Sequence, residues 1–155
     1  MSMTSNEQSV IDGFTVRRTI HIAAPMSKVW AAITQPEHLA QWFPERATLE
    51  PLAVGASGFF EWSDHGAFPV IVEAIDEPHS ISYRWGNNNA SPIALDADHS
   101  TVFTFSLVEV ADGTQLTVVE TGFETLTDPA GSLEGNRGGW NSELDELVAY
   151  LEGAA

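Results

Sequence analysis

The sequence contains no cysteine, and this absence excludes several kinds of chemistry at once. Without thiols, the chain of 155 residues forms no disulfide bond, builds no thiolate metal site and has no cysteine nucleophile. Its stability must therefore come from packing. Apolar residues make up 43% of the chain, which is enough for the core of one ordinary domain.

Basic residues are also scarce. Six Lys and Arg stand against 22 Asp and Glu, so the formal net charge is −16. Because this excess repels phosphate backbones and anionic membrane surfaces, we expect neither a nucleic acid partner nor a membrane partner. No apolar run approaches the roughly 18 residues of a membrane span, and the N-terminus does not resemble a signal peptide. We therefore expect a cytoplasmic protein.

Familiar catalytic motifs are missing as well. The chain has no G-x-S-x-G elbow and no phosphate loop of the G-x-x-x-x-G-K type, which disfavours nucleophilic hydrolases and nucleotide-using enzymes. Its histidines do not have metal-ligand spacing, so we predict no metal site and no cofactor. The run GNRGGW at 135–140 could hold an anion with the help of Arg137, but a flexible entry to the last helix is the favoured interpretation.

What is present is a clear order of elements. Apolar and polar residues alternate over 14–22, which predicts a strand, and two short helices follow at Pro25 and Pro36. Alternating segments between turn residues predict five more strands, and Asp112-Gly113 is typical of a hairpin between the last two. We expect a mobile tail over 1–13, one domain over 14–155, strands at 58–63, 68–76, 79–86, 101–110 and 114–122, and an amphipathic final helix over 140–152.

This order predicts an α+β fold in which a curved antiparallel sheet is covered on its apolar face by the final helix. Alternation places an aromatic-rich set of side chains on that face. Ordinary packing in the core explains each of them alone, but together they could line a cleft between sheet and helix. The candidate ligand-binding residues of this lining are Trp42, Phe43, Val70, Val72, Tyr83, Trp85, Phe103, Phe105, Leu116, Val118, Trp140 and Leu144.

Two charged residues fall on the same inward faces and complete the candidate site. Arg18 shares the face of Val16 and Ile20, and Glu120 shares the face of Leu116 and Val118. If the two strands are neighbours, Arg18 and Glu120 could form a structural ion pair, which would offset the cost of burying each charge. The functional alternative is a polar anchor for a ligand, with Glu120 able to move a proton if burial raises its pKa.

Five segments in their order and spacing carry a resemblance to a known family: RRTIHIAAPMSKVWAAITQPEHLAQWF, PLAVGASGFFEW, VIVEAIDEPHSISYRWG, STVFTFSLVEVADGTQLTVVETGF and GGWNSELDELVAYLEG. Through them the chain resembles the START-like superfamily, also called SRPBCC or Bet v 1-like, which has a helix-grip fold. Within it, the chain is similar to the family of the C-terminal domain of the heat-shock protein 90 ATPase activator. The resemblance implies a cavity between the long helix and the sheet that takes lipids, polyketides, hormones or aromatic compounds in different members.

Three functions are compatible with these observations. The favoured one is binding of a small hydrophobic or aromatic molecule in the cavity, without covalent catalysis. An enzyme similar to the polyketide cyclases and aromatases of the superfamily is the first alternative, with Arg18, Tyr83 or Glu120 polarising the substrate. A protein-interaction or chaperone-associated module is the second. The absence of a catalytic constellation favours binding over an enzyme.

Overall fold

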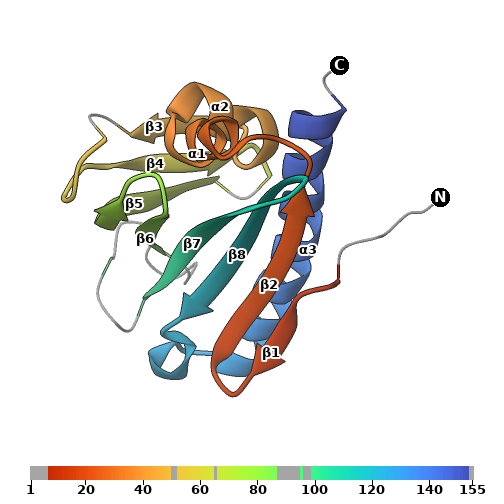
Figure 1. Ribbon diagram of the computed structural model, residues 1–155. Helices are drawn as coiled ribbons and strands as arrows, with labels where there is room; N and C mark the ends of the chain where they lie inside the picture. Colours follow the sequence, from red (N-terminus) through yellow and green to blue (C-terminus); the bar gives the residue numbers. More distant parts are fainter. Residues whose placement is uncertain (1–6, 50–51, 65, 87–94, 96–98, 154–155) are drawn as a thin grey trace.

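The protein folds as a curved sheet with one long helix lying along it (Figure 1). The computed structural model describes residues 7–49, 52–64, 66–86, 95 and 99–153. Within these ranges the helices are α1 (Met26–Thr34), α2 (Pro36–Trp42), a single 3₁₀ turn η1 (Phe123–Thr125) and α3 (Pro129–Glu152). The strands are β1 (Val10–Asp12), β2 (Thr15–Ile22), β3 (Arg46–Leu49), β4 (Ser57–Trp62), β5 (Gly66–Asp76), β6 (Ser80–Gly86), β7 (Ser100–Val110) and β8 (Gly113–Thr121).

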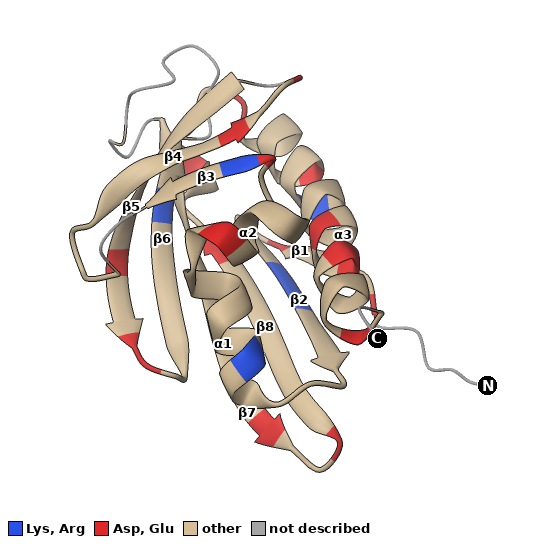
Figure 2. Cartoon of the chain, turned by 90° about the horizontal axis from the view of Figure 1, so that it is seen from above, with Lys and Arg blue, Asp and Glu red and all other residues tan. Residues whose placement is uncertain are grey.

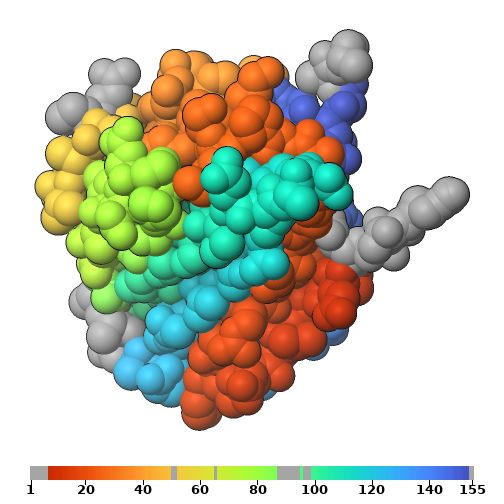
Figure 3. Space-filling view, in the orientation of Figure 1, coloured from red at the N-terminus to blue at the C-terminus, as the bar shows by residue number. Residues whose placement is uncertain are grey.

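The strands form an antiparallel sheet in the order β1-β2-β8-β7-β6-β5-β4-β3. The helix α3 lies behind β2 and β8 in Figure 1, while α1 and α2 lie across one end of the sheet. Seen from the opposite side of the sheet from α3, the strands β2, β8 and β7 lie next to one another under a continuous layer of side chains (Figure 3). This arrangement confirms the predicted α+β helix-grip fold.

The core lies between the sheet and the helices, and it is rich in aromatic rings. Trp42, Phe105 and Trp140 meet there, with ring centroids 6.2 Å apart for Trp42 and Phe105 and 5.7 Å apart for Phe105 and Trp140. Such edge and tilted contacts add to the free energy gained by burying the rings. In the part of the chain that the structure describes, no helix is long and apolar enough to cross a membrane.

The strands predicted from alternation are present, with boundaries shifted by one or two residues. The hairpin at Asp112-Gly113 is confirmed, because β7 and β8 pair from Val110 and Gly113 onward. Continued alternation from Val70 and Val72 predicts that Ala74 faces the core, and this assignment is wrong. A register shift between Val72 and Ala74 in β5 turns Ala74 outward and brings Ile75 against the core. A bulge of this kind interrupts the period of two on which the assignment depended.

The final helix is longer than predicted. It begins at Pro129 and not at Trp140, so the run GNRGGW is helical and is not a flexible entry. Asp128 caps the helix, with its side chain accepting a hydrogen bond from the backbone N–H of Gly131 at 3.2 Å. Leu133 and Trp140, seven residues apart, are both buried. Cap and core contacts therefore outweigh the poor helix propensity of the glycines.

The N-terminal segment contains structure where a tail was expected. Within 1–13, strand β1 pairs with β2 through Val10 and Arg17, and Ser9 is buried against α3. The short strand β3 was likewise not predicted. Residues 1–6, and most of the connection between the strands predicted at 79–86 and 101–110, lie outside the described residues.

Candidate functional site

A cleft of about 270 Å³ opens between the middle of α3 and the strands β4, β5 and β6. A narrower inner pocket of about 70 Å³ shares five of its lining residues and extends toward Phe43 and Trp140. The outer cleft is lined by Trp62, Phe68, Trp85, Gly86, Asn136, Gly139 and Glu143.

Aromatic rings form the sheet side of the cleft. Trp62 lies at the end of β4, and its ring centroid is 5.6 Å from that of Phe68 and 6.1 Å from that of Trp85. Phe43 and Trp140 stand behind them, 5.5 Å apart. Because Trp62, Phe68 and Trp85 are only partly buried, some of their apolar surface remains free for another molecule.

The helix side of the cleft is built from three residues on one face of α3. Asn136, Gly139 and Glu143 follow one another at the spacing i, i+3, i+7, which places them on the same side of a helix. Gly139 contributes no side chain to this wall of the cleft, and a Cβ atom added there would meet nothing within 4 Å. A larger side chain at this position would project into open space.

The carboxyl group of Glu120 organises the inner wall of the cleft without lining it. It accepts hydrogen bonds from the indole nitrogens of Trp140 at 2.8 Å and Trp85 at 2.9 Å, and from Nδ2 of Asn136 at 3.0 Å. The hydroxyl group of Thr101 also donates to it. Burial raises the pKa of Glu120, although these donors oppose the change. Three of its four described partners line the cleft or the inner pocket.

Among the described residues that line the cleft, Glu143 is the one with a titratable side chain. Partial burial raises its pKa to about 7, and the neighbouring Glu146 carboxylate contributes to the increase. Among the described residues, no donor or cation pairs with its carboxyl group. A carboxyl group in this condition can accept a hydrogen bond or a positive charge from a bound molecule, or exchange a proton near neutral pH.

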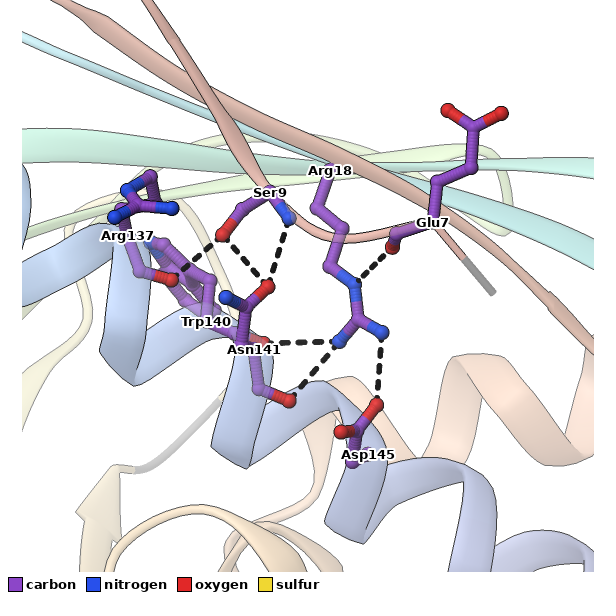
Figure 4. A network of polar contacts seen from close by, with 7 residues as sticks. All are labelled: Glu7, Ser9, Arg18, Arg137, Trp140, Asn141 and Asp145. Carbon is purple, nitrogen blue, oxygen red and sulfur yellow. Dashed lines mark hydrogen bonds and ion pairs between the residues drawn. The ribbon is translucent and has the colours of Figure 1, made fainter. Parts of the chain in front are cut away.

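Arg18 and Glu120 are both buried, as predicted, but they do not pair with each other. β2 and β8 are neighbours, yet Arg18 points toward α3 (Figure 4). Its guanidinium donates to the carbonyl oxygens of Trp140 at 3.3 Å and Asn141 at 3.0 Å, to Asp145 at 2.8 Å and to the carbonyl oxygen of Glu7 at 2.7 Å. Arg18 therefore ties the N-terminal segment to α3, and each buried charge has its own partners.

Other polar groups of the predicted site serve the fold. The hydroxyl group of Tyr83 donates to the carbonyl oxygen of Ile33 at 2.7 Å, and the indole nitrogen of Trp42 donates to that of Ala32 at 2.8 Å. Burial raises the pKa of the Tyr83 hydroxyl group above its ordinary value. The Tyr83 bond fixes α1 to the sheet, and the Trp42 bond fixes α2 to α1.

Of the predicted ligand contacts, Phe43, Trp85 and Trp140 line the cleft or its inner pocket. The remaining eleven lie in the closed core, where aromatic rings fill the space between sheet and helix. The cleft is therefore smaller than the predicted set of ligand-binding residues suggests. That any of these eleven residues contacts a ligand stays a prediction. The eleven are Arg18, Trp42, Val70, Val72, Tyr83, Phe103, Phe105, Leu116, Val118, Glu120 and Leu144.

The helix side of the cleft was missed for an identifiable reason. Asn136, Gly139 and Glu143 belong to one face only if the helix continues through the glycine run, and that run was interpreted as a flexible segment. Asp128 followed by Pro129 is a helix start signal in the sequence and could have corrected this. Gly86 in β6 carries no signal of this kind.

Comparison with known families agrees with this structure. The family model described as "Activator of Hsp90 ATPase homolog 1-like protein" matches residues 23–152. The chain belongs to this family. The resemblance to the heat-shock protein 90 ATPase activator family, inferred from the sequence segments, is thereby confirmed. No curated protein matches the sequence of this family member.

Solved structures with the same fold include several bacterial proteins. Protein MLL2253 from Mesorhizobium loti is 28% identical with a TM-score of 0.78, and the match covers 91% of this chain and 98% of that one. DynU16, a protein of the dynemicin biosynthetic locus, is 26% identical with a TM-score of 0.74, covering 91% of this chain and 48% of that one. CalU16 from Micromonospora echinospora is 18% identical with a TM-score of 0.70, covering 96% and 87%, and it shares the fold.

Proposed function

We propose that this member of the Hsp90 ATPase activator homolog 1-like family binds a small aromatic molecule in the cleft between α3 and β4–β6. The observation that carries the proposal is the partly open wall of Trp62, Phe68 and Trp85 facing a helix surface without a side chain at Gly139. Apolar, concave surfaces with a few polar groups are the usual sites of small-molecule binding.

The dimensions of the cleft support a ligand of one or two rings. An apolar cavity of about 150 Å³ is large enough for benzene. The cleft has about 270 Å³ and is open to solvent, so it has room for a two-ring compound. The relationship to DynU16, which comes from a biosynthetic locus, also agrees with a role in small-molecule metabolism.

The proposal is tested by closing the cleft from the helix side. We expect naphthylmethanol to change the tryptophan fluorescence of the protein, because Trp62 and Trp85 would contact it. Gly139→Leu should weaken this binding by about tenfold or more, since the new side chain occupies the cleft. The matched control is Gly138→Leu, one residue away on the exposed side of the same helix. If naphthylmethanol does not bind, or if both variants bind it equally, the proposal is wrong.

A catalytic role is the second candidate, and Glu143 favours it. A carboxyl group with a pKa of about 7 at the edge of an aromatic cleft has the proton affinity of a general acid or base near neutral pH. This corresponds to the cyclase-like or aromatase-like alternative. Turnover of a bound compound that is lost in Glu143→Gln would favour catalysis over simple binding.

A further inference from the structure

The lining of the cleft carries charge of one sign only, and this selects among aromatic ligands. Glu143 supplies a carboxyl group, and the facing strands β4, β5 and β6 supply Trp62, Phe68, Trp85 and Gly86, none of which titrates. Among the described lining residues no Lys, Arg or His faces it. The described part of the cleft therefore offers negative charge without a compensating cation.

The aromatic wall has the same electrostatic preference as the carboxylate. The faces of indole and phenyl rings carry partial negative charge, and they attract ammonium groups that come within about 6 Å of the ring centroid. Anions gain nothing from these faces. Because Trp62, Phe68 and Trp85 lie within 6.3 Å of one another, a cation between them and Glu143 would contact several rings at once.

The surroundings strengthen this preference. Glu146 is close enough to raise the pKa of Glu143 by repulsion between the two carboxylates. The outward face of α3 is acidic along much of its length (Figure 2), and the whole chain carries a formal charge of −16. A field of this sign concentrates cations near the cleft and repels anions.

From these observations we infer that the ligand of the cleft is an organic cation: an aromatic molecule bearing a quaternary or protonated amine, with the positive charge held between Glu143 and the rings of Trp62 and Trp85. This inference rests on the proposed function, and it names the chemical class of the ligand. The ring system of the ligand would fill the apolar part of the cleft, and its cationic group would supply the partner that Glu143 lacks among the described residues.

The inference implies a definite pH dependence. Glu143 must be ionised to attract the cation, so binding should strengthen as the pH rises through about 7, the value to which burial and Glu146 bring its pKa. A quaternary ammonium ligand does not titrate, and therefore any change in its affinity reports on the protein. The facing strands add no titratable group to the cleft, and Glu146 is the neighbouring charge on α3.

The test compares two compounds with the same ring system. Naphthylmethyl-trimethylammonium carries a permanent positive charge, and naphthylmethanol carries none. At about pH 8 and physiological salt, we expect the cation to bind about tenfold more tightly, measured by tryptophan fluorescence and isothermal titration calorimetry. At about pH 5.5 this advantage should fall to about threefold or less, while binding of the alcohol stays the same.

The variant Glu143→Gln should abolish the advantage of the cation over naphthylmethanol, because the side chain then carries no negative charge at any pH. Glu146→Gln is the matched control, because it removes the same charge from an exposed position on the same helix and should retain the preference at high pH. Equal affinity for both compounds would overturn the inference while leaving the proposed function intact, and so would an equal loss of preference in both variants. Failure of naphthylmethanol to bind would overturn the proposed function itself.

Discussion

At the scale of single residues, the buried carboxyl group of Glu120 is held by hydrogen bonds from several side chains. Two of its described partners, Trp85 and Trp140, have indole N–H groups that can only donate. Asn136 donates to both of its oxygens. Glu120 therefore sets the positions of two rings and one amide that line the cleft and its inner pocket. Its effect on a ligand would pass through these side chains.

We expect Glu120→Gln to destabilise the protein by about 2 kcal/mol, because a side-chain amide presents an N–H₂ group to donors on one side and removes the acceptor that they use there. Relief from burying a charge offsets part of this cost, but it cannot restore the missing acceptor. Urea unfolding followed by tryptophan fluorescence measures the change. Glu109→Gln, an exposed carboxyl group on β7, is the control and should be neutral. An unchanged free energy of unfolding in Glu120→Gln would contradict the role assigned to Glu120.

The sequence predicted the burial of Arg18 and Glu120 but not their partners. Alternation reports which face of a strand a side chain occupies, and both residues are on the buried face. The direction of a long side chain depends on acceptors far away in the sequence. For Arg18 these include backbone carbonyl oxygens of α3, which no pattern in β2 reveals.

At the scale of elements, α3 shows how tertiary packing overrides propensity. Four glycines at 131, 135, 138 and 139 favour a loop, each costing about 1 kcal/mol relative to alanine within a helix. The N-cap Asp128 and the buried anchors Leu133 and Trp140 nevertheless keep the segment helical. Gly139 also lines the cleft without a side chain. The element that sequence patterns described least well is therefore the one that shapes the candidate site.

Replacing glycines of α3 should reveal its helical state directly. Gly135→Ala and Gly138→Ala should each raise the free energy of unfolding by about 1 kcal/mol, because a Cβ atom at either position meets nothing within 4 Å and alanine favours the helix. Gly122→Ala should have the opposite effect, since Gly122 has a φ of 101°. Urea unfolding measures all three. No gain at 135 or 138 would indicate that the segment is not a stable helix.

At the scale of the whole molecule, the order of most elements could be predicted from the sequence, because the strands and helices that cover the core each bury one face. The periods of two and 3.6 record that burial, and the resemblance to a known family supplied the topology. The cleft was less accessible. Its size depends on how the rings of Phe43, Phe103 and Trp140 pack together, and many packings share the same inward-facing pattern.

The boundary of the fold at the N-terminus differs for a similar reason. Apolar alternation begins at Phe14, but the segment before it is held mainly by polar contacts. The backbone N–H of Ser9 donates to Oδ1 of Asn141 at 2.7 Å, its hydroxyl group donates to the carbonyl oxygen of Arg137 at 2.6 Å, and Glu7 accepts from Arg18. Hydrophobic periodicity cannot detect an attachment of this kind.

Truncation of the chain tests where the folded unit begins. Deleting residues 1–13 removes the ladder of β1, the hydrogen bonds of Ser9 to Arg137 and Asn141, and the carbonyl oxygen that Arg18 uses at Glu7. We expect the free energy of unfolding to fall by about 2–4 kcal/mol, because the buried guanidinium loses an acceptor and α3 loses its hydrogen bonds with Ser9. Hydrogen exchange should also accelerate around residues 137–141 of α3.

Deleting residues 2–6 is the control, since it removes none of these contacts and should leave the free energy of unfolding within about 0.5 kcal/mol of the full chain. If both truncations unfold at the same urea concentration as the full chain, the folded unit begins at Phe14, as alternation alone indicates. If only the longer truncation is destabilised, the polar contacts of Glu7 and Ser9 belong to the fold, and Arg18 is the residue that connects them to the helix beside the cleft.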